Sequence, residues 1–135
     1  VIFCVANNGV NEMTFNLIES CRINKINIVV FALDKSISKF LENVCDVVNY
    51  FVELGGNQIY EYETENFKKV AYYRFFILGE LLRDNRKIIY LDIDIFVNKN
   101  FINEISYELN KYDVVIQTNG KNCCTGFFAI RPTDD

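Results

Sequence analysis

The segment that most restricts the fold is residues 87–97, KIIYLDIDIFV, where an unbroken apolar run leads directly into two aspartates. The consecutive apolar residues Ile88–Leu91 predict a strand that is buried on both faces, as at the centre of a parallel sheet. Because side chains alternate along a strand, we expect Asp92 and Asp94 to point to the same side. The sequence therefore predicts a pair of carboxylates at the end of a central strand.

Two carboxylates placed so close together repel each other, and one of them is expected to take up a proton if no partner is present. A hard divalent cation removes this repulsion, because Mg²⁺ and Mn²⁺ prefer carboxylate and phosphate oxygens as ligands. We therefore predict a metal site formed by Asp92 and Asp94.

Strand-like and helix-like segments alternate along the chain. The predicted strands are residues 1–6, 26–33, 46–51, 87–97, 113–118 and 125–131, and the predicted helices are residues 11–21, 36–45, 65–84 and 101–110. This alternation predicts an α/β fold with a mostly parallel, Rossmann-like sheet and helices on both faces. Residues 54–64 form the longest irregular stretch and are a candidate loop or lid. We expect one domain, residues 1–135, truncated at its C-terminus.

Composition excludes several classes of function. The net charge is −4, and no basic cluster exceeds two neighbouring residues, which argues against binding to a nucleic-acid backbone. Apolar runs stay below the roughly 18 residues that a membrane span needs. The chain contains no histidine, which excludes histidine-based relays and ligands within it, and its five cysteines show no CxxC spacing. We therefore expect free thiols in a reducing compartment, and hence a cytoplasmic protein.

One arginine occupies an unusual position in the longest predicted helix, residues 65–84. Arg74 lies within the apolar stripe that is expected to face the protein interior. A guanidinium on an inward face needs an anion or carbonyl groups, because an unpaired buried charge is costly. The partner is either a bound ligand or a nearby carboxylate in a structural salt bridge, and the sequence leaves both alternatives open.

Polar residues follow several of the predicted strands. They are Asn7 and Asn8, Asp34, the two aspartates at 92 and 94, and Gln117. In open parallel sheets, ligands bind outside the carboxyl ends of the strands, so these residues are expected to surround a common site. Asn7-Asn8-Gly9 is either a simple turn or a loop that faces a nucleotide, and Asp34 either caps the next helix or contacts a ribose or base.

The segment YYRFFILGELLRDNRKIIYLDIDIFVNKNF, residues 72–101, resembles the core of nucleotide-sugar-dependent glycosyltransferases of the GT-A fold. In that family an arginine on a helix precedes a strand that ends in a DxD motif. Residues 33–35 (LDK), 116–119 (IQTN) and 125–133 (TGFFAIRPT), together with Asn7-Asn8-Gly9, resemble its nucleotide-diphospho-sugar transferase branch.

The resemblance implies an enzyme that moves a hexose from a nucleotide-diphospho-sugar, in particular a UDP-sugar, to a glycan, protein or small-molecule acceptor with retention of configuration. Asp92 and Asp94 would hold Mn²⁺ or Mg²⁺ against the diphosphate, and Arg74 would contact the donor near that ion. The remaining donor contacts that it implies are Ala6, Asn7 and Asn8 at the nucleoside, and Gln117, Thr125 and Gly126 near the sugar.

The sequence also departs from the family pattern. Asn119 stands where an acidic residue is expected, and no histidine after the DxD motif completes the metal ligands. Two alternatives therefore stay open. One is a haloacid-dehalogenase-like phosphatase with Asp92 as nucleophile and Asp94 as general acid. The other is a non-catalytic nucleotide-binding module or an inactive fragment, since a fold alone does not define a function.

Overall fold

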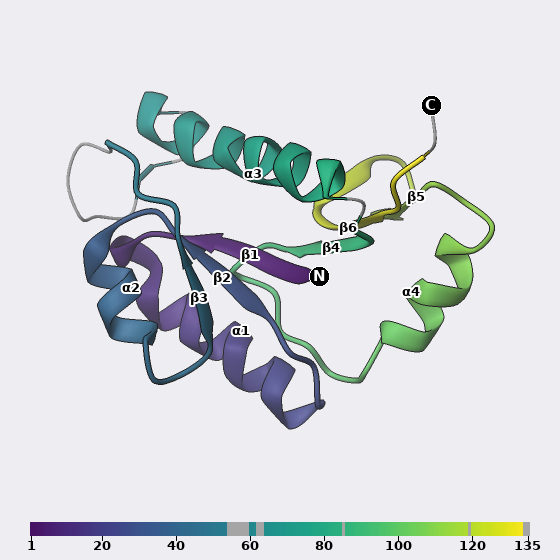
Figure 1. The fold of residues 1–135 in the computed structure, drawn as a ribbon, viewed down its shortest axis with the longest axis horizontal. Helices are drawn as coiled ribbons and strands as arrows, with labels where there is room; N and C mark the ends of the chain where they lie inside the picture. Colours follow the sequence, from purple (N-terminus) through teal and green to yellow (C-terminus); the bar gives the residue numbers. More distant parts are fainter. Residues whose placement is uncertain (54–59, 62–63, 85, 119, 134–135) are drawn as a thin grey trace.

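A computed structural model of the chain describes residues 1–53, 60–61, 64–84, 86–118 and 120–133. Figure 1 shows its elements in chain order, and their bounds are β1 (Ile2–Ala6), η1 (a 3₁₀ turn, Asn8–Val10), α1 (Asn11–Ile23), β2 (Val29–Ala32), α2 (Lys35–Leu41), β3 (Asp46–Asn49), α3 (Glu65–Arg83), β4 (Ile88–Leu91), α4 (Ile102–Leu109), β5 (Val114–Thr118) and β6 (Cys123–Ile130). This order confirms the predicted alternation of strands and helices. Most of the predicted loop at 54–64 lies outside the described residues.

The described strands form one six-stranded sheet in the order β3-β2-β1-β4-β6-β5. β3, β2, β1 and β4 are parallel neighbours, whereas β6 is antiparallel to both β4 and β5. The sheet is therefore mostly parallel, as predicted, with β6 as the reversed strand. Because β6 runs backwards, its first residues meet the carboxyl ends of the other strands.

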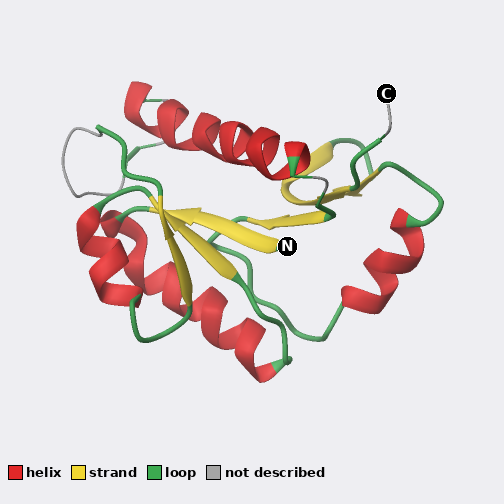
Figure 2. Ribbon diagram, viewed as in Figure 1, coloured by secondary structure: helices red, strands yellow, loops and turns green. Residues whose placement is uncertain are grey.

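The sheet separates two apolar clusters, and Figure 2 shows α3 on one side of it with α1 and α2 on the other. In β1, Cys4 and Ala6 pack in the cluster that includes α1 and α2, whereas Phe3 and Val5 pack in the cluster that includes α3. The strict alternation of these buried residues explains why β1 has no polar position. Helices on both faces of the sheet are therefore confirmed.

The central strand β4 is shorter than the sequence predicts. It ends at Leu91, and the Ile95 amide donates to the Asp92 carbonyl oxygen at 3.2 Å, which closes a turn. Asp92 and Asp94 therefore follow the strand instead of lying within it. The prediction that strand alternation orients them was wrong, because β4 ends at Leu91 and the chain turns between Asp92 and Ile95.

A polar anchor holds the chain that follows this turn. The Ser20 hydroxyl accepts a hydrogen bond from the Val97 amide at 3.1 Å, and Asn24 Nδ2 donates to the Val97 carbonyl at 2.8 Å. Asn100 Nδ2 in turn donates to the Asn24 carbonyl at 3.0 Å. The end of α1 thus holds residues 97–100 in place. This segment follows the turn that carries the two aspartates.

We predict that Asn24→Ala lowers the free energy of unfolding by about 1–3 kcal/mol, because it leaves the Val97 carbonyl without its side-chain donor. Urea denaturation followed by circular dichroism measures this change. Asn27→Ala is the matched control, since Asn27 is exposed and its removal is expected to change stability by less than about 0.5 kcal/mol. Equal losses in the two variants would contradict the anchoring role of Asn24.

Candidate functional site

A cavity of about 510 Å³ opens at the carboxyl edge of the sheet, where α3, the end of β1, the end of β4 and the start of β6 meet. Its polar lining residues are Asn7, Arg74, Asp92, Asp94 and Thr125. Its remaining lining residues are apolar or aromatic, namely Val5, Val10, Met13, Tyr60, Phe67, Val70, Ala71, Tyr90 and Ile93. The cavity thus combines an apolar wall with one concentrated group of charges.

Asp92 is the most highly connected residue of this group. Its Oδ1 accepts a hydrogen bond from the Tyr90 hydroxyl at 2.6 Å and lies 3.4 Å from Arg74 Nη1. Burial raises the pKa of Asp92 and the Asp94 charge raises it further, while Tyr90 and Arg74 oppose this rise. The carboxylate therefore lies in a place where its negative charge is only partly compensated by the protein.

Tyr90 is a residue of the site that the sequence analysis missed. It is 4% exposed, and burial together with the neighbouring Asp92 charge raises the pKa of its hydroxyl well above the usual range. The hydroxyl is therefore protonated at neutral pH and acts as a donor. One signal was available in the sequence, because a tyrosine within a buried apolar run needs a hydrogen-bond partner for its hydroxyl.

Arg74 reaches the same place from α3. Its Nη1 lies 3.4 Å from Asp92 Oδ1 and 3.5 Å from the Thr125 carbonyl oxygen, and its Nη2 lies 3.2 Å from Thr125 Oγ1. These distances equal or exceed the upper end of ordinary N–H···O bonds, which are about 2.7–3.2 Å long. Its buried Nε has no acceptor among the described residues. Arg74 thus forms the ion pair with Asp92 that the salt-bridge alternative predicts. Its Nε–H still has no acceptor among the described residues, so the guanidinium can donate a further hydrogen bond.

Asp94 differs from Asp92 in its surroundings. Asp94 is exposed at the cavity, whereas Asp92 is partly buried beneath Arg74. Among the described residues, no group of three or more histidine, cysteine, aspartate or glutamate side chains is placed to hold a metal ion. A cation at this place would therefore take protein ligands from the two aspartates, with its other positions left to oxygens of water or ligand.

Asp34 follows β2, and its carboxylate also binds the loop that follows β1. Its Oδ1 accepts from the Ser36 and Ile37 amides at 2.9 Å each, and its Oδ2 accepts from the Asn8 amide at 2.7 Å. The helix-cap alternative for Asp34 is confirmed, and this cap also holds the loop after β1. A contact between Asp34 and a ribose or base stays a prediction.

The other predicted nucleoside contacts lie in different places. Asn7 is buried and lines the cavity, while Ala6 is fully buried in the cluster beneath α1 and α2. Asn8 is partly buried, and its backbone N–H donates a hydrogen bond to the Asp34 carboxylate. The structure therefore brings Asn7 to the cavity, whereas Ala6 and Asn8 are not among the residues that line it.

Gln117 lies apart from the group around Asp92. It lines a second cavity, of about 600 Å³, with Phe101, Phe127 and other apolar residues beneath α4. In the sheet Gln117 pairs with Cys124, next to a register shift between Ile116 and Gln117. Its predicted place near a donor sugar stays a prediction, and Asn119 lies outside the described residues.

Gly126 packs directly against Asp92. The Asp92 amide donates to the Gly126 carbonyl at 2.7 Å, and a Cβ atom added to Gly126 would lie 2.8 Å from Asp92 Oδ2. Real Cβ atoms essentially never approach an oxygen so closely. A side chain at this position would therefore have to displace the Asp92 carboxylate.

Comparison with known protein families gives a match. A family model described as nucleotide-diphospho-sugar transferase matches residues 25–135, which is more than half of the chain. It favours the glycosyltransferase resemblance over the phosphatase alternative. No curated protein matches the chain. Within the described residues, every helix is too short or too polar to cross a membrane.

We predict that Gly126→Ala lowers the free energy of unfolding by about 1–3 kcal/mol, because the new methyl group displaces a carboxylate that Tyr90 and Arg74 hold in place. Thermal and urea denaturation measure this loss.

Gly79→Ala is the matched control, since a Cβ at this position in α3 meets nothing within 4 Å. It is expected to raise stability by about 0.5–1 kcal/mol through helix propensity. A Gly126→Ala protein that is as stable as Gly79→Ala would show that the Asp92 carboxylate is free to move.

Proposed function

The chain belongs to the nucleotide-diphospho-sugar transferase family, and from this premise we propose that it is a metal-dependent glycosyltransferase that uses a nucleotide-diphospho-sugar as donor. One observation supports this proposal most strongly. Arg74 from α3, the two aspartates after β4, and Thr125 at the start of β6 converge on a single cavity at the carboxyl edge of the sheet. Such an edge is where ligands bind in open α/β folds.

The carboxylates of Asp92 and Asp94 fit a hard divalent cation, either Mn²⁺ or Mg²⁺. Ions of this kind bind through one or two carboxylates and fill their other positions with water and phosphate oxygens. The raised pKa of Asp92 agrees with this role, because an ionised carboxylate at this place lacks full compensation from the protein. When bound, the cation would supply Lewis-acid stabilisation of the negative charge that grows on the departing diphosphate.

Arg74 would provide a second positive charge to the diphosphate. A guanidinium binds phosphate oxygens through two parallel hydrogen bonds, and such bonds are stronger than those between neutral groups. Arg74 is suited to this role because its bonds to Asp92 and Thr125 are long and its Nε is unpaired among the described residues. It can shift toward a phosphate without losing a strong interaction.

The two parts of the cavity suggest how the donor is oriented. The apolar wall formed by Val10, Met13 and Val70 offers a surface for the nucleoside, with Asn7 as a hydrogen-bonding group beside it. Thr125, which contacts Arg74, and Gly126, which packs against Asp92, would border the sugar. A UDP-linked hexose as donor and retention of configuration are part of the proposal and rest on the family resemblance.

We predict that UDP or GDP binds the protein in the presence of Mn²⁺, and that Asp94→Ala weakens this binding at least about tenfold by removing a metal ligand. Isothermal titration calorimetry with MnCl₂ measures the affinity.

Asp46→Ala is the matched control, since Asp46 is an exposed aspartate in β3 that does not line the site cavity. It should bind the nucleotide as the unaltered protein does. Equal affinity in EDTA and in MnCl₂ would refute the role of the cation.

We predict that Arg74→Ala weakens nucleotide binding about tenfold to a hundredfold, which corresponds to the roughly 1.5–3 kcal/mol of a hydrogen bond to a charged group. Its melting temperature should change little, because the ion pair with Asp92 is long. Calorimetry and thermal denaturation on the same samples separate the two effects.

Arg83→Ala, at the exposed end of the same helix, controls for loss of an arginine from α3. If Arg74→Ala merely melts earlier while its folded fraction binds nucleotide with unchanged affinity, Arg74 is a structural residue.

A further inference from the structure

Tyr90 combines burial with a short hydrogen bond to the central carboxylate of the site. Its hydroxyl donates to Asp92 Oδ1 at 2.6 Å from a side chain that is almost fully buried. We propose that Tyr90 is a positioning residue that fixes the Asp92 carboxylate in the orientation needed to bind cation and donor. This inference rests on the proposed function and adds a residue to it.

The position of the hydroxyl is determined by the packing of the tyrosine ring. The ring stacks on Phe128 of β6 with centroids 5.1 Å apart and an interplanar angle of 25°. It also forms an edge-to-face pair with Phe3 in β1, with centroids 5.2 Å apart. Aromatic contacts from both neighbouring strands therefore hold the ring, and the hydroxyl cannot follow Asp92 if that side chain rotates.

The Asp92 carboxylate is confined on its other sides as well. Oδ2 lies against Gly126, where a Cβ atom would approach it to 2.8 Å, and Oδ1 also faces Arg74 Nη1 at 3.4 Å. The bond from Tyr90 is the shortest of these side-chain contacts and comes from the most deeply buried partner. Tyr90 is thus the residue that selects one orientation of the carboxylate.

The same ring lies beneath the arginine of the site. Arg74 Cζ is 5.5 Å from the centroid of the Tyr90 ring, within the range of a cation–π contact. Tyr90 therefore contacts both the anionic and the cationic group of the cavity, through its hydroxyl and its ring face respectively. Replacing the hydroxyl alone keeps the contact of the ring with Arg74 and removes the polar contacts of the hydroxyl with Asp92 and Arg74.

A carboxylate that is already oriented does not have to be ordered when cation and donor bind. A residue that forms a hydrogen bond to a metal ligand orients that ligand, and removing such a residue lowers metal affinity by about 10–100-fold. The side chains that contact a ligand keep the geometry needed for binding only when supporting hydrogen bonds hold them in place. The loss of the Tyr90 hydroxyl is therefore expected to act on cation-dependent binding more than on the fold.

Tyr90→Phe tests this inference, because it keeps the ring and its contacts with Phe128, Phe3 and Arg74 while removing the donor to Asp92. Calorimetry should show that the Kd of the nucleoside diphosphate in MnCl₂ rises about tenfold. The Mn²⁺ concentration at which the protein reaches half of its maximal affinity for the nucleotide should rise as well. A purely structural role of Tyr90 would lower the melting temperature and leave this Mn²⁺ dependence unchanged.

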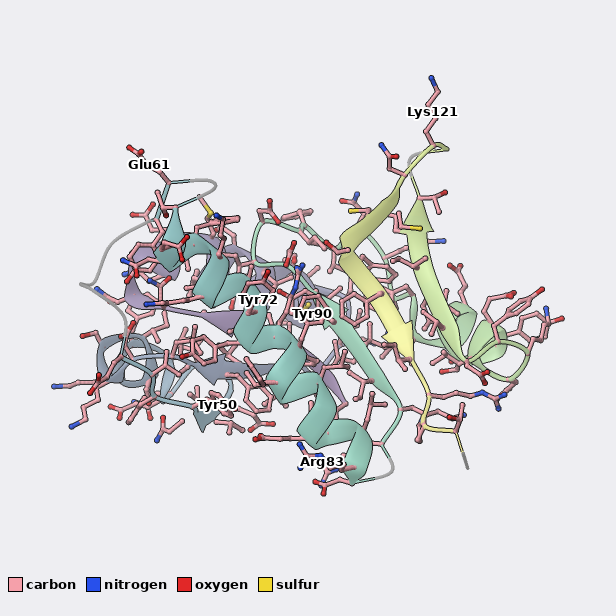
Figure 3. All side chains as sticks on the ribbon, turned by 90° about the horizontal axis from the view of Figure 1, so that it is seen from above. Tyr50, Glu61, Tyr72, Arg83, Tyr90 and Lys121 are labelled. Carbon is pink, nitrogen blue, oxygen red and sulfur yellow. The ribbon has the colours of Figure 1, made fainter. Side chains whose placement is uncertain are left out.

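Tyr50→Phe is the matched control. Figure 3 shows Tyr90 and Tyr50 on opposite sides of α3 in that view, and Tyr50 is absent from the lining of the site cavity. Its hydroxyl donates to Glu80 at 3.4 Å, so this variant also loses one tyrosine hydroxyl from the α3 side of the sheet. Its Kd and its Mn²⁺ dependence are expected to equal those of the unaltered protein.

The outcomes separate this inference from the proposed function. If the unaltered protein binds UDP or GDP with Mn²⁺ and Tyr90→Phe does so with the same Kd and Mn²⁺ dependence, Tyr90 is a core residue and the inference is wrong. The proposed function stands in that case. If the unaltered protein binds neither nucleotide in a Mn²⁺-dependent way, the proposed function fails, and the role of Tyr90 fails with it.

Discussion

The antiparallel pairing of β6 with β4 is the interaction on which the candidate site depends. It places Phe127 opposite Leu91, and it lets the Asp92 amide donate to the Gly126 carbonyl beyond the end of β4. Without this reversed strand, Thr125 would not lie beside Arg74, and the carboxylate of Asp92 would face solvent where it now faces Gly126. The backbone hydrogen bonds of the sheet therefore assemble residues that are more than thirty positions apart.

The electrostatics of the site follow from this arrangement. Asp92 is partly buried beneath Arg74, and this burial raises its pKa even though a tyrosine hydroxyl and a guanidinium stabilise its charge. Asp94 remains exposed at the cavity and adds a second negative charge. A partly buried carboxylate of this kind is tolerated when a positive partner completes the charge balance, and the cation of the proposed function would be such a partner.

The surroundings of the site are organised by polar contacts between distant segments. Asp34 joins the loop after β1 to the start of α2, and Asn24 at the end of α1 holds the chain that leaves the aspartate turn. Both are short polar side chains that satisfy backbone groups at helix ends, which is where unpaired amides and carbonyls occur. The cavity wall is therefore supported by the same residues that cap the helices.

The sequence by itself determined the α/β class, the helices on both faces, and the place of Asp92 and Asp94 at the end of a central strand. These follow from hydrophobic periodicity and from polar residues at strand ends, both of which are local patterns. The closeness of Arg74 to the two aspartates was implied by the family resemblance alone. The tertiary structure decided the direction of β6, the turn after Leu91, the bond from Tyr90 to Asp92 and the separation of Gln117 from the first cavity. Each of these depends on the pairing and packing of residues far apart in the chain, and the local pattern of one segment carries no information about which partner it meets.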